Sequence, residues 1–105
     1  MKLHKKRVKI EGTPTYIYLT NKIAGLGDSY NNGNENIILI HSMQSDMEKL
    51  ITLIHEAIHL TPGKNINTGG GMENHRVERL AKAIANVLVE SEVISLYDND
   101  SLDLR

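Results

Sequence analysis

Two histidines and a glutamate stand at the spacing of a metal site near the middle of the chain. The segment ITLIHEAIHL, residues 51–60, contains the pattern H-E-x-x-H as His55, Glu56 and His59. On a helix, residues four apart lie one above the other, so the two imidazoles can present nitrogens to one small cation. Glu56 lies to the side of this pair, where its carboxylate can take a proton from a metal-bound water. The pattern therefore predicts half of a zinc site with a general base beside it.

Sequence signals around this segment predict the helix that the spacing requires. Ser45 and Glu48 have the spacing of a capping box, in which each side chain bonds the backbone N–H of the other residue. The helix is expected to begin near Asp46 and to end at the breaker sequence Thr61-Pro62-Gly63. Apolar residues recur along it at helical spacing, at Met47, Leu50, Ile51, Ile54, Ala57 and Ile58. The histidines fall on a separate stripe, off the expected core face.

A catalytic zinc needs a third protein ligand, which must come from another element. A second helix is predicted from Glu73 to about Leu96, with a buried face at Val77, Leu80, Ala81, Ile84, Val87 and Leu88. Its candidate ligands are Glu73, His75 and Glu78. Glu78 borders the apolar face, so it can point towards the first helix while staying hydrated. His75 lies one turn earlier and is the competing ligand.

The N-terminal part carries signals of β-structure. Residues 8–10 and 16–19 are rich in β-formers and are separated by turn residues, which predicts a hairpin. The apolar run Asn36–His41 predicts a strand, either covered on both faces or at the edge beside the metal helix. The Gly- and Asn-rich segment 21–36 is expected to cross the surface, with a short helical turn around Lys22–Ala24. The expected fold is α+β, a small and mostly antiparallel sheet packed against two long helices.

Length and composition narrow the classes of function. The 105 residues are expected to form a single domain, residues 1–105. There is no cysteine, so a metal must be held by histidine and carboxylate. The net charge of −1 gives no reason to expect nucleic-acid binding, and no run approaches the length of a membrane span. The basic N-terminus lacks the apolar region of a secretory signal, so a cytoplasmic protein is expected. The protein is also expected to be a monomer.

Two of these segments resemble a known family. The sequence TLIHEAIH at 52–59, followed by VERLA at 77–81, is similar to small phage and bacterial metallopeptidases of the gluzincin type, sometimes called minigluzincins. A more distant likeness is to ImmA/IrrE-type peptidases. A Gly-Asp-x-Tyr element at 27–30 and an I-x-I strand at 38–40 extend the likeness over about residues 8–96.

The resemblance implies a minimal zincin fold, Zn²⁺ as cofactor and Glu78 as third ligand. In one respect the chain departs from the family. The gluzincin pattern E-x-x-x-D would place an aspartate at position 82, where this chain has Lys82. Such a carboxylate orients a ligand histidine and raises its basicity. Asn86, or an aspartate elsewhere in the chain, would have to supply that contact, or metal binding is weaker than usual.

The activity expected from these residues is hydrolysis of peptide bonds in a peptide or protein substrate. Glu56 acts as general base, and an extended substrate can pair with the strand Ile37–Ile40. The donor to the reaction oxyanion stays open between His75, Tyr30 and Tyr97.

Three alternatives compete with this interpretation. A low-activity or latent protein could use the same scaffold for regulation or binding, for example on a repressor partner, and the small size of the chain favours this. A di-iron carboxylate protein would need a second E-x-x-H, which the second helix lacks. A metal-free structural domain is the third alternative.

Overall fold

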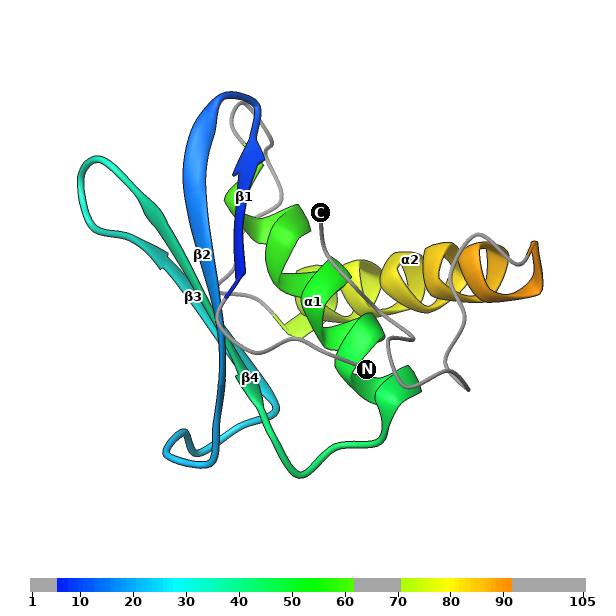
Figure 1. The fold of residues 1–105 in the computed structure, drawn as a ribbon. Helices are drawn as coiled ribbons and strands as arrows, with labels where there is room; N and C mark the ends of the chain where they lie inside the picture. Colours follow the sequence, from blue (N-terminus) through cyan, green and yellow to red (C-terminus); the bar gives the residue numbers. More distant parts are fainter. Residues whose placement is uncertain (1–5, 62–70, 92–105) are drawn as a thin grey trace.

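The computed structural model describes residues 6–61 and 71–91, which form four strands and two helices (Figure 1). The elements in chain order are β1 (Lys6–Ile10), β2 (Thr13–Thr20), β3 (Gly27–Asn31), β4 (Asn36–His41), α1 (Asp46–Leu60) and α2 (Gly71–Glu90). The α+β class is the one predicted from the sequence. The helices, of 15 and 20 residues, are of ordinary length rather than long. In the described ranges neither helix combines the length and apolarity needed to cross a membrane.

The four strands form one mixed sheet in the order β1-β2-β4-β3. β1 pairs with β2 and β3 pairs with β4 in antiparallel fashion, whereas the central pair β2 and β4 is parallel. The predicted N-terminal hairpin is confirmed. Its turn is Glu11-Gly12, and both residues have positive φ angles, of 46° and 86°. A two-residue hairpin turn needs positive φ angles at its central residues, which explains the glycine at position 12.

The segment between residues 21 and 36 differs from its prediction. It contains β3, which pairs with β4 over the register from Gly27 opposite Ile40 to Asn31 opposite Asn36. Residues 22–24 contain no helical turn. The sequence of β3, GDSYN, is poor in β-forming residues, so its strand forms through pairing with β4 rather than through local preference.

The strand β4 is neither covered on both faces nor at an edge, contrary to both expectations. It lies inside the sheet, between β2 and β3. Its burial alternates along the strand, with Asn36, Ile38 and Ile40 buried on the side of the helices. Its apolar run therefore reflects a central position with one covered face.

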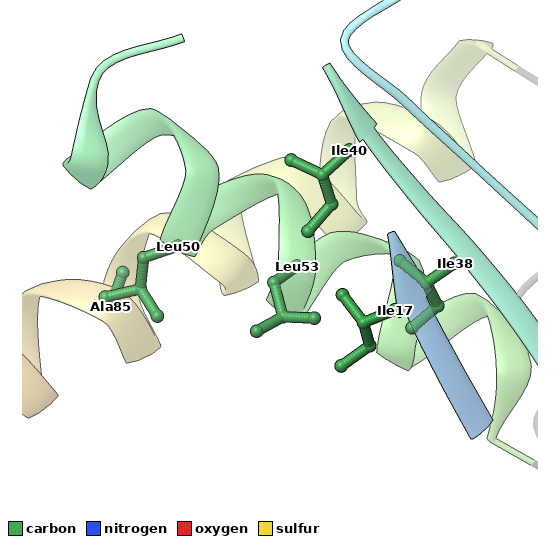
Figure 2. Close-up of a cluster of buried hydrophobic side chains, with 6 residues drawn as sticks. All are labelled: Ile17, Ile38, Ile40, Leu50, Leu53 and Ala85. Atoms are coloured by element: carbon green, nitrogen blue, oxygen red, sulfur yellow. The ribbon is translucent and has the colours of Figure 1, made fainter. Parts of the chain in front are cut away.

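Both helices lie on the same side of the sheet, and α2 crosses α1 (Figure 1). Figure 2 shows buried side chains of the hydrophobic core, which come from the sheet and from both helices: Ile17, Ile38, Ile40, Leu50, Leu53 and Ala85. The capping box at the start of α1 is confirmed. Ser45 Oγ accepts from the Glu48 N–H at 3.2 Å, and the Ser45 N–H donates to Glu48 Oε1 at 3.1 Å. This cap fixes the start of α1 at Asp46, nine residues before His55.

The buried face of α2 is narrower than predicted. Val77, Ala81 and Ala85 are buried, but the predicted core residues Leu80, Ile84 and Val87 are exposed by 48%, 37% and 65%. Among the described elements, α2 packs mainly against α1. The side of α2 that meets α1 carries small alanines, so the larger apolar residues lie outside the contact. The predicted continuation of the helix to Leu96 lies outside the described residues.

Candidate active site

The two histidines of the H-E-x-x-H pattern face each other on α1. His55 Nε2 and His59 Nε2 lie 3.0 Å apart. The ring centroids are 4.7 Å apart, and the rings meet edge to face at 69°. The four-residue spacing therefore brings the two imidazoles together as predicted.

Glu78 reaches this pair from α2. Its Oε1 lies 3.0 Å from His55 Nδ1, and the two side chains are 18% (His55) and 37% (Glu78) exposed. An ionised carboxylate only accepts hydrogen bonds, so in this contact the Nδ1 of His55 carries the proton and donates. In the neutral ring the lone pair then lies on Nε2, the nitrogen that faces His59. This is the tautomer that a metal bound between the two Nε2 atoms requires.

Glu78 thus contacts one of the two predicted histidine ligands, His55, through the ring nitrogen turned away from His59. The prediction that Glu78 is the third ligand stays a prediction, since the same oxygen would have to leave Nδ1 to join a metal at Nε2. In its present place the carboxylate makes the orienting contact that the resemblance assigned to another residue. Lys82, at the position where the family has aspartate, lies 4.0 Å from Glu78 Oε2. Asn86 is exposed on α2.

Glu56 is buried between α1 and β3. Only 8% of it is exposed, and Ser29 Oγ donates to its Oε1 at 2.6 Å. A Cβ atom added at Gly27 would lie 3.2 Å from Glu56 Oε2 and 2.5 Å from Thr52 Cγ2. Glycine at position 27 therefore lets β3 approach α1 closely at the level of the glutamate.

A hollow lies on each side of His55 and Glu56. The first, of about 450 Å³, is lined by Leu26, Gly27, Thr52, His55, Glu56, His75 and Glu78. The second, of about 490 Å³, is lined by Gly27, Asp28, Ser29, His55, Glu56, His59 and Leu60. The predicted base and the first histidine thus stand at the centre of an open groove that runs beside β3.

The remaining candidates are placed differently. The exposed side chain of His75 lines the first hollow together with His55 and Glu78, and both of its predicted roles stay predictions. Tyr30 is 49% exposed and alternates with Ser29 on β3, so it points to the sheet face away from the helices and the groove. The side chain of Glu73 and the whole of Tyr97 lie outside the described residues.

The donors at the site are those that zinc accepts, imidazole nitrogen and carboxylate oxygen. Two nitrogens on one tetrahedral zinc, each about 2.05 Å from it, lie roughly 3.3 Å apart. The 3.0 Å between the Nε2 atoms of His55 and His59 is close to that separation. In the part of the chain that the structure describes, no three or more such side chains form a metal-binding group. The fit therefore concerns the histidine pair.

Comparison with known protein families, with curated proteins and with solved structures finds no match to this chain.

Sequence reasoning missed the β3 side of the site. Ser29 and Gly27 lie in a segment that was expected to cross the surface, yet they contact or flank Glu56. Thr52, on α1, is buried beside them, and its hydroxyl donates to Gln44 at 2.8 Å. The available signal was the Gly-Asp-x-Tyr element at 27–30, which carries no indication of its own that Ser29 faces the helix.

Proposed function

We propose that this chain is a zinc-dependent peptidase that hydrolyses peptide bonds in a peptide or protein substrate. The observation that supports this most is the line of contacts from Glu78 through His55 to His59, with the carboxylate of Glu56 buried next to it. The line brings together donors from two helices, 23 residues apart in sequence. A histidine pair with two carboxylates beside open hollows is an arrangement that suits metal-assisted hydrolysis.

In this proposal His55, His59 and Glu78 would be the three protein ligands of the zinc. A zinc ion bound there would polarise the scissile carbonyl and lower the pKa of a coordinated water towards neutrality. Glu78 sets the tautomer of His55 before the metal arrives, because it accepts the Nδ1 proton.

Glu56 moves the proton during the reaction. Its carboxylate accepts a proton from the attacking water while the new C–O bond forms at the scissile carbonyl. It then delivers that proton to the amine nitrogen as the C–N bond breaks, so that one water is consumed for each bond cut. Only 8% of Glu56 is exposed, so its carboxylate meets the solvent only through the hollows beside it.

The substrate is placed along β3 rather than β4. The strand β4 has neighbours on both sides, so the predicted pairing of a substrate with Ile37–Ile40 is wrong. In the described residues β3 pairs on one side only, and its other edge borders the groove. An extended peptide that pairs with this edge has the two hollows available for the side chains on either side of the scissile bond.

The test uses protein purified without a histidine tag. Zinc bound after gel filtration is measured by mass spectrometry, and cleavage is measured on a library of peptides. Wild type and Glu56→Gln should each retain about one zinc per chain, but only wild type should cleave. His55→Ala should lose the metal, whereas the control His41→Ala, at the end of β4, should keep it. Cleavage by Glu56→Gln at the wild-type rate, or clearly substoichiometric zinc in wild type, would overturn the proposal.

A latent protein on the same scaffold is the second candidate, and two contacts favour it. Glu78 occupies Nδ1 of His55, and Ser29 occupies an oxygen of Glu56. In this arrangement both carboxylates form hydrogen bonds with other side chains of the protein. This candidate predicts full zinc binding with no cleavage in either wild type or Glu56→Gln, so the same experiment separates the two.

A further inference from the structure

We propose that Ser29 is a positioning residue for Glu56, so that the strand β3 holds the general base in place. This inference rests on the proposed peptidase function. It begins from the hydrogen bond from Ser29 Oγ to Glu56 Oε1, at 2.6 Å, which joins residues 27 positions apart on different elements. That length is typical of a hydroxyl bound to an ionised carboxylate, which is stronger than a bond between neutral groups.

Burial makes this bond important for the orientation of Glu56. A buried carboxylate is costly unless hydrogen bonds compensate for the water it has lost. Glu56 is only 8% exposed, and within the described part of the chain Ser29 is its one hydrogen-bond donor. Without that hydroxyl the carboxylate is expected to turn towards the open groove, where water can solvate it.

The backbone of β3 fixes the other side of the same carboxylate. Ser29 lies opposite the core residue Ile38 in the register of β3 and β4, so its side chain faces α1. Two residues earlier, on the same face, Gly27 leaves room for Glu56 Oε2. One oxygen is thus held by the Ser29 hydroxyl, and the other lies against a position that has no side chain.

This arrangement couples two roles to one strand. The same β3 offers its unpaired edge to the substrate and carries the hydroxyl that orients the base. Ser29 touches no reacting atom and acts only through Glu56. A substrate that pairs with β3 is therefore aligned against the element that sets the position of the proton acceptor.

The test compares Ser29→Ala, Ser29→Thr and a matched serine control, Ser42→Ala, which lies beyond β4. Ser29→Ala should lower kcat by roughly 10- to 100-fold, with KM and bound zinc unchanged. Ser29→Thr keeps the hydroxyl and suits a strand, so kcat should recover to within about threefold of wild type. Ser42→Ala should match wild type. In a Glu56→Gln background, Ser29→Ala should cause no further loss of the remaining activity.

Three outcomes would overturn the inference. Unchanged kcat in Ser29→Ala would show that the base needs no such support. A loss of zinc together with kcat, or a failure of Ser29→Thr to restore it, would show a general structural role. In each of these three outcomes wild type still hydrolyses peptides, so the proposed function stands. A wild type that binds no zinc and cleaves nothing would overturn the proposed function, and the inference with it.

Discussion

Replacing Gly27 by alanine should separate β3 from α1, because the added methyl group has no room. Its Cβ would lie 2.5 Å from Thr52 Cγ2, whereas carbon atoms in contact prefer about 3.5–4.0 Å. The strand would have to move by roughly 1 Å or more at this point. It cannot move freely, since Leu39 O of the neighbouring strand would also lie only 3.3 Å from the new atom.

The expected cost follows from other overpacked sites. Inserting a methyl group into a filled space usually destabilises a protein by about 1–3 kcal/mol. Gly27 has no positive φ angle, so alanine suits the backbone and the cost is steric alone. In a domain of this size each kcal/mol lowers Tm by roughly 4–8 °C.

The partner of the clash provides the decisive variant. Thr52→Ser removes the Cγ2 atom but keeps the hydroxyl that donates to Gln44. Alone it should cost about 1 kcal/mol, the value of a buried methyl group. Combined with Gly27→Ala it should recover about 1 kcal/mol relative to the sum of the single changes. Gly25→Ala is the control, because the nearest atom to its added Cβ would lie 4.0 Å away.

The free energies of unfolding come from urea titrations of the four proteins of the cycle and the control. If Gly27→Ala is as stable as Gly25→Ala, the close approach of β3 to Glu56 is not as described. If the double variant shows simple additivity, the clash does not involve Thr52.

Three further predictions concern the cap, the helix contact and the metal. Ser45→Ala should cost about 1 kcal/mol in urea unfolding at neutral pH. The hydrogen bonds from Ser45, first from its backbone and then from its side chain, hold the pKa of Glu48 below its ordinary value of 4.5. The resulting stability is present above pH 4.5 and is lost as the pH falls through the folded pKa. Ser45→Ala removes the side-chain donor but keeps the backbone N–H, the larger of the two causes, so it should flatten that part of the pH profile only in part. A stability equal to that of wild type at neutral pH would contradict the cap. Ala85→Leu should lower the free energy of unfolding by about 1–3 kcal/mol, because Ala85 is buried. The control Ala83→Leu, exposed on the same helix, should stay within about 0.5 kcal/mol of wild type. Equal effects would contradict the packing of α2 on α1. Glu78→Gln should weaken zinc binding, measured by calorimetry, by at least roughly 10-fold, and an unchanged affinity would contradict Glu78 as the third ligand.

The helix α1 could be predicted closely because its signals are local. The capping box of Ser45 and Glu48, the apolar spacing and the breaker after Leu60 each act within a few residues, and together they mark both ends. The same locality places His55 and His59 together, since their proximity depends only on helical geometry.

The strand β3 and the packing of α2 were harder to predict, because both depend on contacts between segments that are distant in the sequence. The strand β3 has little β-forming sequence and exists through its pairing with β4, so Ser29 could not be placed against Glu56 in advance. The apolar spacing of α2 correctly placed Val77 and Ala81 on its buried face, but it did not show how narrow that face is. Larger apolar residues of the predicted face lie outside the contact with α1, because the helices meet through the small residues Ala81 and Ala85, which allow close packing.

The attachment of α2 has a consequence for how the carboxylate of Glu78 is presented. Among the described residues, this helix packs chiefly against α1 and takes no part in the sheet. Elements anchored on one side open at a lower free energy than the fold as a whole, so amide protons of α2 should exchange with solvent before those of β2 and β4. The position of Glu78 relative to His55 can then readjust without disturbing the strands.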